Sequence, residues 1–174
     1  MSNETVLQNL ESGLLTITMN RPERRNALNV DMTLGLVAAA RRAAEDQEVR
    51  AVLLKGAGGT FCVGGDVKSM AEGRAPQSFE NRMVNLRRGM EVSRILHEMS
   101  KPVVAQLDGA AAGAGLSIAL SCDFRVASQS VKITTAFAKV GLSGDYGGTY
   151  FLTQMLGSAK AREQIGRARV GKEC

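Results

Sequence analysis

The sequence is poor in the residues that build metal centres and nucleic-acid stacking surfaces. Aromatic residues make up 4% of the 174 residues, Trp is absent, and His97 is the only histidine. The three cysteines, Cys62, Cys122 and Cys174, do not have the spacing of a zinc site. Surfaces that bind single-stranded nucleic acid depend on aromatic platforms, which are scarce here. We therefore expect no metal ion and no nucleic-acid partner.

The sequence also lacks a long hydrophobic run and a secretory leader pattern. A membrane-spanning helix needs about 20 apolar residues, so we expect no membrane association. The few thiols, odd in number, favour a reducing compartment, and we expect a cytoplasmic location. The 22 Lys and Arg residues exceed the 17 Asp and Glu residues, giving a formal net charge of +5. This scattered excess fits a phosphate-bearing small molecule or an ordinary solvated surface.

Two glycine-rich turns are the most informative feature that is present. They are Phe-Cys-Val-Gly-Gly-Asp at 61–66 and Gly-Ala-Ala-Ala-Gly-Ala-Gly at 109–115. Each turn follows a strand-like apolar run and precedes a helix-like one, where backbone N–H groups lack intrahelical partners. Two such turns that converge on one point would form an oxyanion hole, which stabilises charge on a carbonyl oxygen. The pair therefore predicts acyl chemistry with backbone donors.

Apolar periodicity predicts an α/β fold with partly parallel strands and a single domain over residues 1–174. The expected strands are residues 14–19, 49–54, 103–107, 124–127 and 131–133. The first expected helix runs from a cap at Asn29 or Asp31 to about residue 46, and a short helix begins near Asp66. A long helix begins at a cap at Ser78 and ends before Pro102. A further helix follows the second glycine-rich turn and ends at about Leu120, and the last spans about residues 148–156. In the long helix, Phe79, Met83, Leu86 and Met90 share an apolar face, and Ser158 is a candidate cap for a further helix.

Four segments, in this order, resemble signatures of the crotonase, or enoyl-CoA hydratase/isomerase, superfamily. They are residues 20–28, 61–70, 108–123 and 141–149, and the resemblance extends from about residue 5 to 162. It implies a crotonase/ClpP-like spiral of ββα units that is shortened at its C-terminal end, because family members normally carry further helices there. The assembly that the resemblance implies is a homotrimer or a dimer of trimers.

The resemblance also implies acyl-CoA thioesters as substrates, with coenzyme A as part of the substrate and no separate cofactor. The oxyanion donors would be the backbone N–H groups of Gly65 and Ala114. Small residues suit these turns independently, because side-chain bulk would keep a carbonyl away from the amides. The residues that would contact the CoA moiety or the rest of the substrate are Arg24, Arg25, Ala27, Val63, Asp66, Val67, Gly113, Ser117 and Phe137.

Hydratases of this family use two glutamates, and the matching positions here hold Ser117 and Phe137. Neither side chain can exchange a proton as a carboxyl group does. Asp145 is the one carboxylate in the segment 141–149 that the resemblance places against the substrate. A single carboxylate can carry a proton between two carbons of an enoyl thioester. The residues therefore favour an isomerase over a hydratase, with Asp145 as the acid/base.

Two alternatives stay open from the sequence. The replaced glutamates and the short chain also fit a catalytically inactive or incomplete acyl-CoA-binding protein. The segment Gly-Leu-Ser-Ile-Ala at 115–119 resembles a nucleophile elbow, which would make Ser117 the nucleophile of an acyl-CoA hydrolase. That reaction needs a base, and the single histidine, His97, is expected at the end of a helix.

Overall fold

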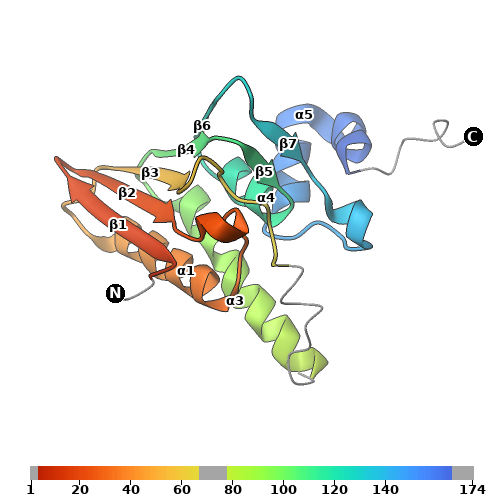
Figure 1. Ribbon diagram of the computed structural model, residues 1–174, viewed down its shortest axis with the longest axis horizontal. Helices are drawn as coiled ribbons and strands as arrows, with labels where there is room; N and C mark the ends of the chain where they lie inside the picture. The colour runs from red at the N-terminus through yellow and green to blue at the C-terminus, as the bar shows by residue number, and fades with distance from the viewer. Residues whose placement is uncertain (1–3, 67–77, 166–174) are drawn as a thin grey trace, which may run out of the picture.

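The computed structural model describes residues 4–66 and 78–165, except for the side chains of residues 139 and 140. The hairpin of β1 (Val6–Glu11) and β2 (Leu14–Met19) forms one edge of a five-stranded sheet. β2 pairs in parallel with β3 (Ala51–Gly56), which pairs with β4 (Val103–Leu107), which pairs with β6 (Phe124–Ala127). β5 (Ala110–Ala112) and β7 (Lys132–Thr134) form a second, parallel pair (Figure 1). The predicted α/β arrangement with parallel strands is confirmed.

Two long helices pack together along the five-stranded sheet, namely α1 (Val30–Glu45) and α3 (Phe79–Glu98) (Figure 1). Both begin at predicted caps. The Asn29 side chain accepts a hydrogen bond from the Met32 amide at 2.9 Å, and the Ser78 hydroxyl accepts one from the Asn81 amide at 3.2 Å. The short helix predicted near Asp66 lies outside the described residues.

The main core lies between the sheet and these two helices. Along β2, β3 and β4 every second side chain is buried, the period expected of a strand with one face in the core. The fully buried aliphatic side chains of this core include Leu15, Ile17, Val52 and Leu54 from the strands and Met32, Leu36 and Leu96 from the helices. This packing fixes the carboxyl ends of β3 and β4, from which the two glycine-rich turns depart.

A second, smaller core joins α4 (Ala114–Leu120) to α5 (Gly148–Gln164). Leu116 and Leu120 of α4 pack with Phe151 and Leu152 of α5. Gly157 interrupts α5 with the non-helical angles φ 76° and ψ 160°, directly before Ser158, where the sequence predicts a new helix. α5 therefore consists of two helical pieces held against α4.

The first half of α3 does not pack as its periodicity predicts. Residues 78–88 are all exposed, and Figure 1 shows this half extending beyond the rest of the molecule. Phe79 is 72% exposed and Leu86 41%, whereas Met90 packs partly against the core. An apolar stripe indicates which residues share a face, but it does not show whether another element covers that face.

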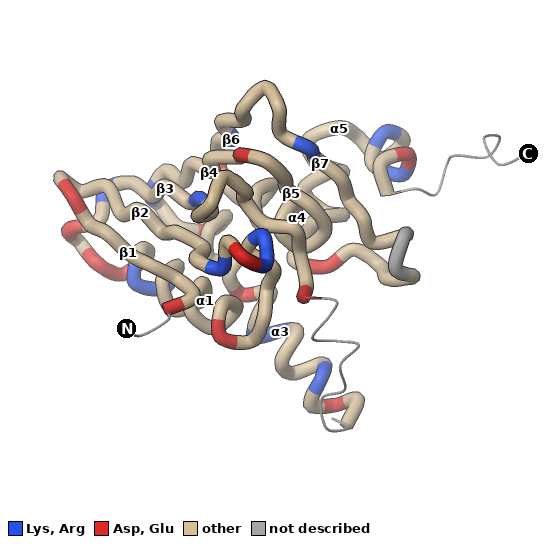
Figure 2. The backbone as a smooth tube through the Cα atoms, in the orientation of Figure 1, with Lys and Arg blue, Asp and Glu red and all other residues tan. Residues whose placement is uncertain are grey.

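The surface carries both signs of charge. Figure 2 shows Lys and Arg interspersed with Asp and Glu along the described chain. In the part that the structure describes, no helix has the length and apolar character needed to cross a bilayer.

Candidate functional site

The first glycine-rich turn pairs with the residue that precedes Asn29. The Leu28 amide donates to the Gly64 carbonyl at 2.8 Å, and the Asp66 amide donates to the Leu28 carbonyl at 3.1 Å. This is the parallel pattern in which Leu28 faces Gly65, so the amide and carbonyl of Gly65 point away from Leu28. Among the described residues, the Gly65 N–H has no hydrogen-bond acceptor.

The second turn is brought to the first by β5. The Cys62 amide donates to the Ala110 carbonyl at 3.0 Å, and the Ala112 amide donates to the Cys62 carbonyl at 2.9 Å. Gly64 then lies directly against the start of α4: a Cβ atom added there would be 3.3 Å from the backbone nitrogen of Ala114. The two turns that the sequence singles out are therefore in contact.

Ala114 begins α4, and the glycine before it has a conformation that requires glycine. Gly113 has φ 52° and ψ −127°, a region that is sterically closed to residues with a Cβ atom. Its carbonyl accepts from the Ser117 amide at 3.0 Å, which starts the helical hydrogen bonding. The Ala114 N–H precedes that bond and finds no acceptor within residues 4–66 and 78–165.

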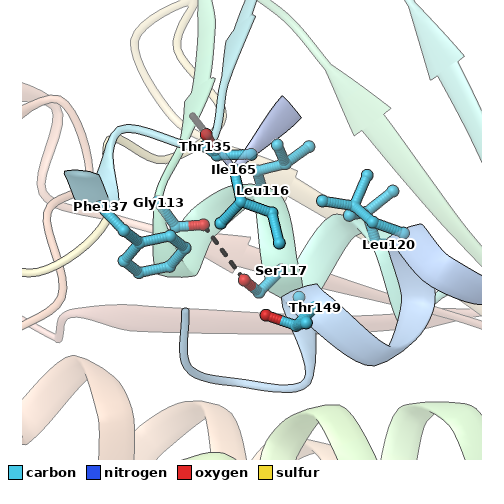
Figure 3. Close-up of a pocket in the computed structure, with 10 residues that line it drawn as sticks. Gly113, Leu116, Ser117, Leu120, Thr135, Phe137, Thr149 and Ile165 are labelled. Atoms are coloured by element: carbon cyan, nitrogen blue, oxygen red, sulfur yellow. Dashed lines mark hydrogen bonds between the residues drawn. The ribbon is translucent and has the colours of Figure 1, made fainter. Parts of the chain in front are cut away.

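A small cavity adjoins the contact between the two turns (Figure 3). Its free volume is about 10 Å³, roughly the space of one water molecule. Apolar side chains of α4, η2 (Phe137–Val140) and α5 line it, among them Leu116, Leu120, Phe137 and Leu152. A ring carbon of Phe137 lies 3.8 Å from the position that a Cβ atom on Gly113 would occupy. Phe137, at a position where the resemblance predicts a glutamate in hydratases, is thus an aromatic wall of this cavity.

Ser117, at the other position where the resemblance predicts a glutamate in hydratases, is buried and hydrogen-bonded. Its hydroxyl donates to the Gly113 carbonyl at 3.3 Å, as Figure 3 shows. Gly148 packs so closely onto this hydroxyl that no Cβ atom would fit there. His97 is exposed, and its ring packs edge-on against Phe151 at a centroid distance of 5.0 Å. None of these contacts of Ser117 involves an imidazole, so the geometry gives no support to a serine nucleophile.

Asp145 lies between η2 and α5, in a segment that borders the same cavity. Gly144 faces the Phe137 ring, and Gly148 packs on Ser117. The Asp145 side chain is half-buried, and its Oδ1 atom has no hydrogen-bond partner among the described residues. Burial raises the pKa of the Asp145 carboxyl from 3.8 to about 6, against the opposing effect of its own backbone N–H. The group therefore titrates in the range where acid/base catalysts work.

Tyr146, which sequence reasoning missed, anchors this segment in the main core. Its side chain is buried and its φ is 49°, in the left-handed region. Its hydroxyl group is hydrogen-bonded to the Thr33 side chain of α1, and burial raises its pKa. On α3, a Cβ atom at Gly89 would lie 2.6 Å from this hydroxyl oxygen. The only sequence signal is an aromatic residue enclosed by Gly144 and Gly147.

The residues predicted to contact CoA gather around one turn. Arg24 and Arg25 are exposed at the end of η1 (Pro22–Arg24), and the Val63 amide donates to the Arg25 carbonyl at 3.3 Å. Ala27 is buried beside them, and Asp66 follows the first glycine-rich turn. Val67 lies outside the described residues. The structure thus brings the N-terminal signature and the first turn together.

Asn26 and Arg21 stabilise this region through hydrogen bonds, and the sequence predicted no role for either residue. Asn26 is fully buried, with φ 55°, and its side-chain amide donates to the carbonyls of Ala57 at 2.9 Å and Thr60 at 2.6 Å. The Arg21 amide donates to the side-chain oxygen of Asn26 at 2.9 Å. The Arg21 guanidinium pairs with Asp66 at 3.1 Å. Asn tolerates positive φ in turns better than most residues do, and this is the signal that could have indicated the role of Asn26.

The chemistry available here does not include a reactive thiol. Cys62 is fully buried, and burial raises its pKa to about 12, so the group stays protonated near neutral pH. Its sulfur accepts a hydrogen bond from the Gly64 amide at 3.4 Å. In the described ranges, no three His, Cys, Asp or Glu side chains are grouped so as to hold a metal ion.

Comparison with known proteins identifies the family. A family model for enoyl-CoA hydratase/isomerase matches residues 9–170. The chain is 36% identical over 179 aligned positions to a 1,2-epoxyphenylacetyl-CoA isomerase of Escherichia coli K12, covering 98% of this chain and 64% of that protein. It is 40% identical to a probable enoyl-CoA hydratase of Rhodobacter capsulatus, covering 92% of this chain and 60% of the relative. The chain therefore spans less than two thirds of the length of these relatives.

The fold agrees with this assignment. A crystal structure of a putative enoyl-CoA hydratase from Thermobifida fusca YX, in complex with acetoacetyl-CoA, superposes with a TM-score of 0.85 at 28% identity, covering 97% of this chain and 68% of that one. The two joined turns and the parallel sheet are those of the crotonase fold. The chain belongs to the enoyl-CoA hydratase/isomerase family.

Proposed function

We propose that this protein binds acyl-CoA thioesters and moves the double bond of an enoyl-CoA, acting as an isomerase. The observation that carries the proposal is the contact of Gly64 with the backbone nitrogen of Ala114. It sets two amides, of Gly65 and Ala114, at one junction with no acceptor among the described residues. Two N–H donors that converge on one carbonyl oxygen stabilise negative charge there, and we assign this role to these two amides.

The CoA moiety lies, in this proposal, along the turn that carries Arg24, Arg25 and Ala27 and along Val63, Asp66 and Val67. Exposed guanidinium groups suit phosphates, which they bind through two parallel hydrogen bonds. The acyl group extends past Gly113 toward Ser117 and Phe137. The acetoacetyl-CoA held by the Thermobifida fusca structure and the CoA thioesters in the relatives' names support this class of ligand.

The reaction needs one proton carrier and one charge stabiliser. The Asp145 carboxylate takes a proton from the carbon next to the thioester carbonyl of a 3-enoyl-CoA. The electron pair moves into the conjugated system, and the negative charge on the thioester oxygen is held by the Gly65 and Ala114 amides. The Asp145 carboxyl then returns the same proton two carbons further along the acyl chain, giving the 2-enoyl-CoA. No electrons leave the substrate, so the step requires no redox partner.

Isomerisation suits the side chains better than hydration does. Adding water to a double bond requires one group to take a proton from water and a group to protonate carbon. Ser117 donates its hydroxyl to the Gly113 carbonyl, and Phe137 has no exchangeable proton. Asp145 alone remains, with a carboxyl whose pKa burial raises to about 6.

We also propose that the protein works in the cytoplasm as a homotrimer or a dimer of trimers. Apolar side chains exposed on β6 and β7, namely Phe124, Val126 and Ile133, support association, because such surface is usually covered in an assembly. Light scattering after size-exclusion chromatography tests this, and a monodisperse monomer at micromolar concentration would contradict it.

Product analysis in deuterated water tests the catalytic proposal. The protein is incubated with 3-enoyl-CoA and with 2-enoyl-CoA, and double-bond migration, water addition and deuterium uptake are followed separately. We expect migration without net hydration, and its loss in Asp145→Asn. The matched control is Asp31→Asn, because Asp31 is an exposed carboxylate on α1. Tight ester binding without any turnover would instead establish the binding-only alternative, and an acyl-enzyme lost in Ser117→Ala would establish the hydrolase.

A further inference from the structure

We propose that Arg21 is a positioning residue, which holds the first glycine-rich turn so that the Gly65 N–H is aimed at the substrate carbonyl. The inference rests on the proposed function, because it assigns a purpose to the same amide. Among the described residues, Arg21 has no hydrogen bond to Gly65, and in the proposal above it does not contact the substrate.

The guanidinium of Arg21 joins the two strands of backbone that meet at the turn. Its Nη1 donates to the Ala27 carbonyl at 2.5 Å, and its Nη2 donates to Asp66 Oδ2 at 3.1 Å. The Arg21 and Asp66 side chains are only 14% and 8% exposed. Because water competes little here, such charge-assisted hydrogen bonds constrain geometry more than surface pairs do.

These contacts close a ring around Gly65. Leu28 donates to the Gly64 carbonyl and accepts from the Asp66 amide, so the backbone on either side of Gly65 is bound to Leu28. The Arg21 guanidinium is hydrogen-bonded to Ala27, the residue before Leu28, and to Asp66, the residue after Gly65. Rotation of the Gly65 peptide would therefore have to break either the Leu28 pairing or the arginine bridge.

Arg21 is itself fixed at its own backbone. Its amide donates to the Asn26 side chain, which in turn donates to the carbonyls of Ala57 and Thr60. The bridge thus runs from the loop after β3 through Asn26 and Arg21 to Asp66. A planar guanidinium can donate to a carbonyl and a carboxylate at once in a fixed geometry, whereas a lysine ammonium offers only a point charge.

The vibrational frequency of the bound thioester carbonyl is the decisive measurement. A hydrogen bond to a carbonyl lowers its stretching frequency, so crotonyl-CoA labelled with ¹³C at the thioester carbon reports directly on the oxyanion contact. We expect a downward shift on binding to the wild-type protein and a clearly smaller shift in Arg21→Met. Turnover of a 3-enoyl-CoA should fall about tenfold to a hundredfold in kcat, the effect of a misplaced donor, with a smaller change in KM.

The matched control is Arg42→Met. Arg42 also pairs with an aspartate, Asp46 at 3.5 Å, but on the exposed face of α1. It should leave the carbonyl shift unchanged. If Arg21 acts through Asp66, the double variant Arg21→Met with Asp66→Asn should lose no more of the shift than the larger single loss.

The outcomes separate the two proposals. An unshifted carbonyl in the bound wild-type protein would overturn the proposed function itself. A shifted carbonyl in the wild type that is equally shifted in Arg21→Met would overturn only the role of Arg21. If Arg21→Met does not fold, Arg21→Lys is used in its place. The lysine keeps a positive charge beside Asp66 but lacks the planar guanidinium that donates to two acceptors at once. A full wild-type shift in a folded Arg21→Lys would also refute the inference.

Discussion

The half-buried carboxyl of Asp145 leads to a quantitative prediction about pH. With its pKa raised to about 6, about one tenth of the group is ionised at about pH 5 and about nine tenths at about pH 7. If the carboxylate takes the proton in the first step, kcat should rise roughly tenfold between these two values, and a logarithmic plot should approach a slope of one only below about pH 5. An aspartate titrating near its usual 3.8 would leave the rate almost flat over this range.

Stability should change in the opposite direction. The pKa of Asp145 is higher in the folded chain than in the unfolded chain, so the folded state binds the proton more tightly. The contribution of this group to the free energy of unfolding is therefore present at low pH and is lost as the pH rises from about 4 to about 6. In this window Asp145→Asn should be at least as stable as the wild type, and its stability should lack this pH dependence.

The assay must avoid phosphate groups, because a phosphate monoester such as that of CoA also titrates near pH 6. A 3-enoyl thioester of N-acetylcysteamine has none, and conjugation of the double bond can be followed by ultraviolet absorbance. The same profile is measured with Asp31→Asn as the control. A wild-type rate that is constant from about pH 5 to about pH 7, or full turnover in Asp145→Asn, would refute the assignment.

Three substitutions test the surrounding structure. Gly64→Ala places a Cβ atom 2.9 Å from the Ala112 carbonyl oxygen and 3.3 Å from the Ala114 nitrogen, so it should abolish ester binding as measured by calorimetry. The control is Gly59→Ala, which is also at positive φ but has no atom within 4 Å of the added Cβ. It should lower the free energy of unfolding by only about 1–2 kcal/mol, the cost of the left-handed backbone. Phe137→Ala removes the cavity wall beside Gly113 and should shift kcat/KM toward longer acyl chains, an expectation that an unchanged chain-length profile would contradict. Asn26→Ala removes three hydrogen bonds between a fully buried side chain and half-buried backbone groups. It should lower the free energy of unfolding by about 3 kcal/mol in urea titration, against about 1 kcal/mol for loss of the Asn29 cap.

Local pattern predicted most of the elements, because each is encoded by neighbouring residues. The β6 range agrees with the prediction at both ends, the Ser78 cap is confirmed, and of the two caps predicted for α1 the structure has Asn29. β1 was missed because its residues are mostly exposed and do not alternate, and it is a strand only through its pairing with β2. β5 was missed because Ala110–Ala112 reads as part of a glycine-rich turn and becomes a strand beside Cys62 and β7.

The candidate site shows the same division. The two turns were recognisable from glycine and the flanking apolar runs, whereas the choice of Gly65 and Ala114 as the donors rests on the resemblance and stays a prediction. The bridge from Arg21 to Asp66 joins residues 45 positions apart and has no local signature. Tyr146 likewise depends on Thr33 and Gly89, which lie on two other elements. Contacts of this kind follow from the folded arrangement, which periodicity does not specify.

The exposed first half of α3, residues 78–88, should affect how fast the backbone amides of this helix exchange hydrogen with water. Residues 78–88 are all exposed, and the Ser78 cap stabilises the first turn of this half. Val92, Ile95 and Leu96 of the second half are buried in the main core. An isolated segment of this length is only marginally helical in water. The amides of one continuous helix should thus fall into two classes, the first exchanging hydrogen through local fraying and the second only when the whole sheet opens.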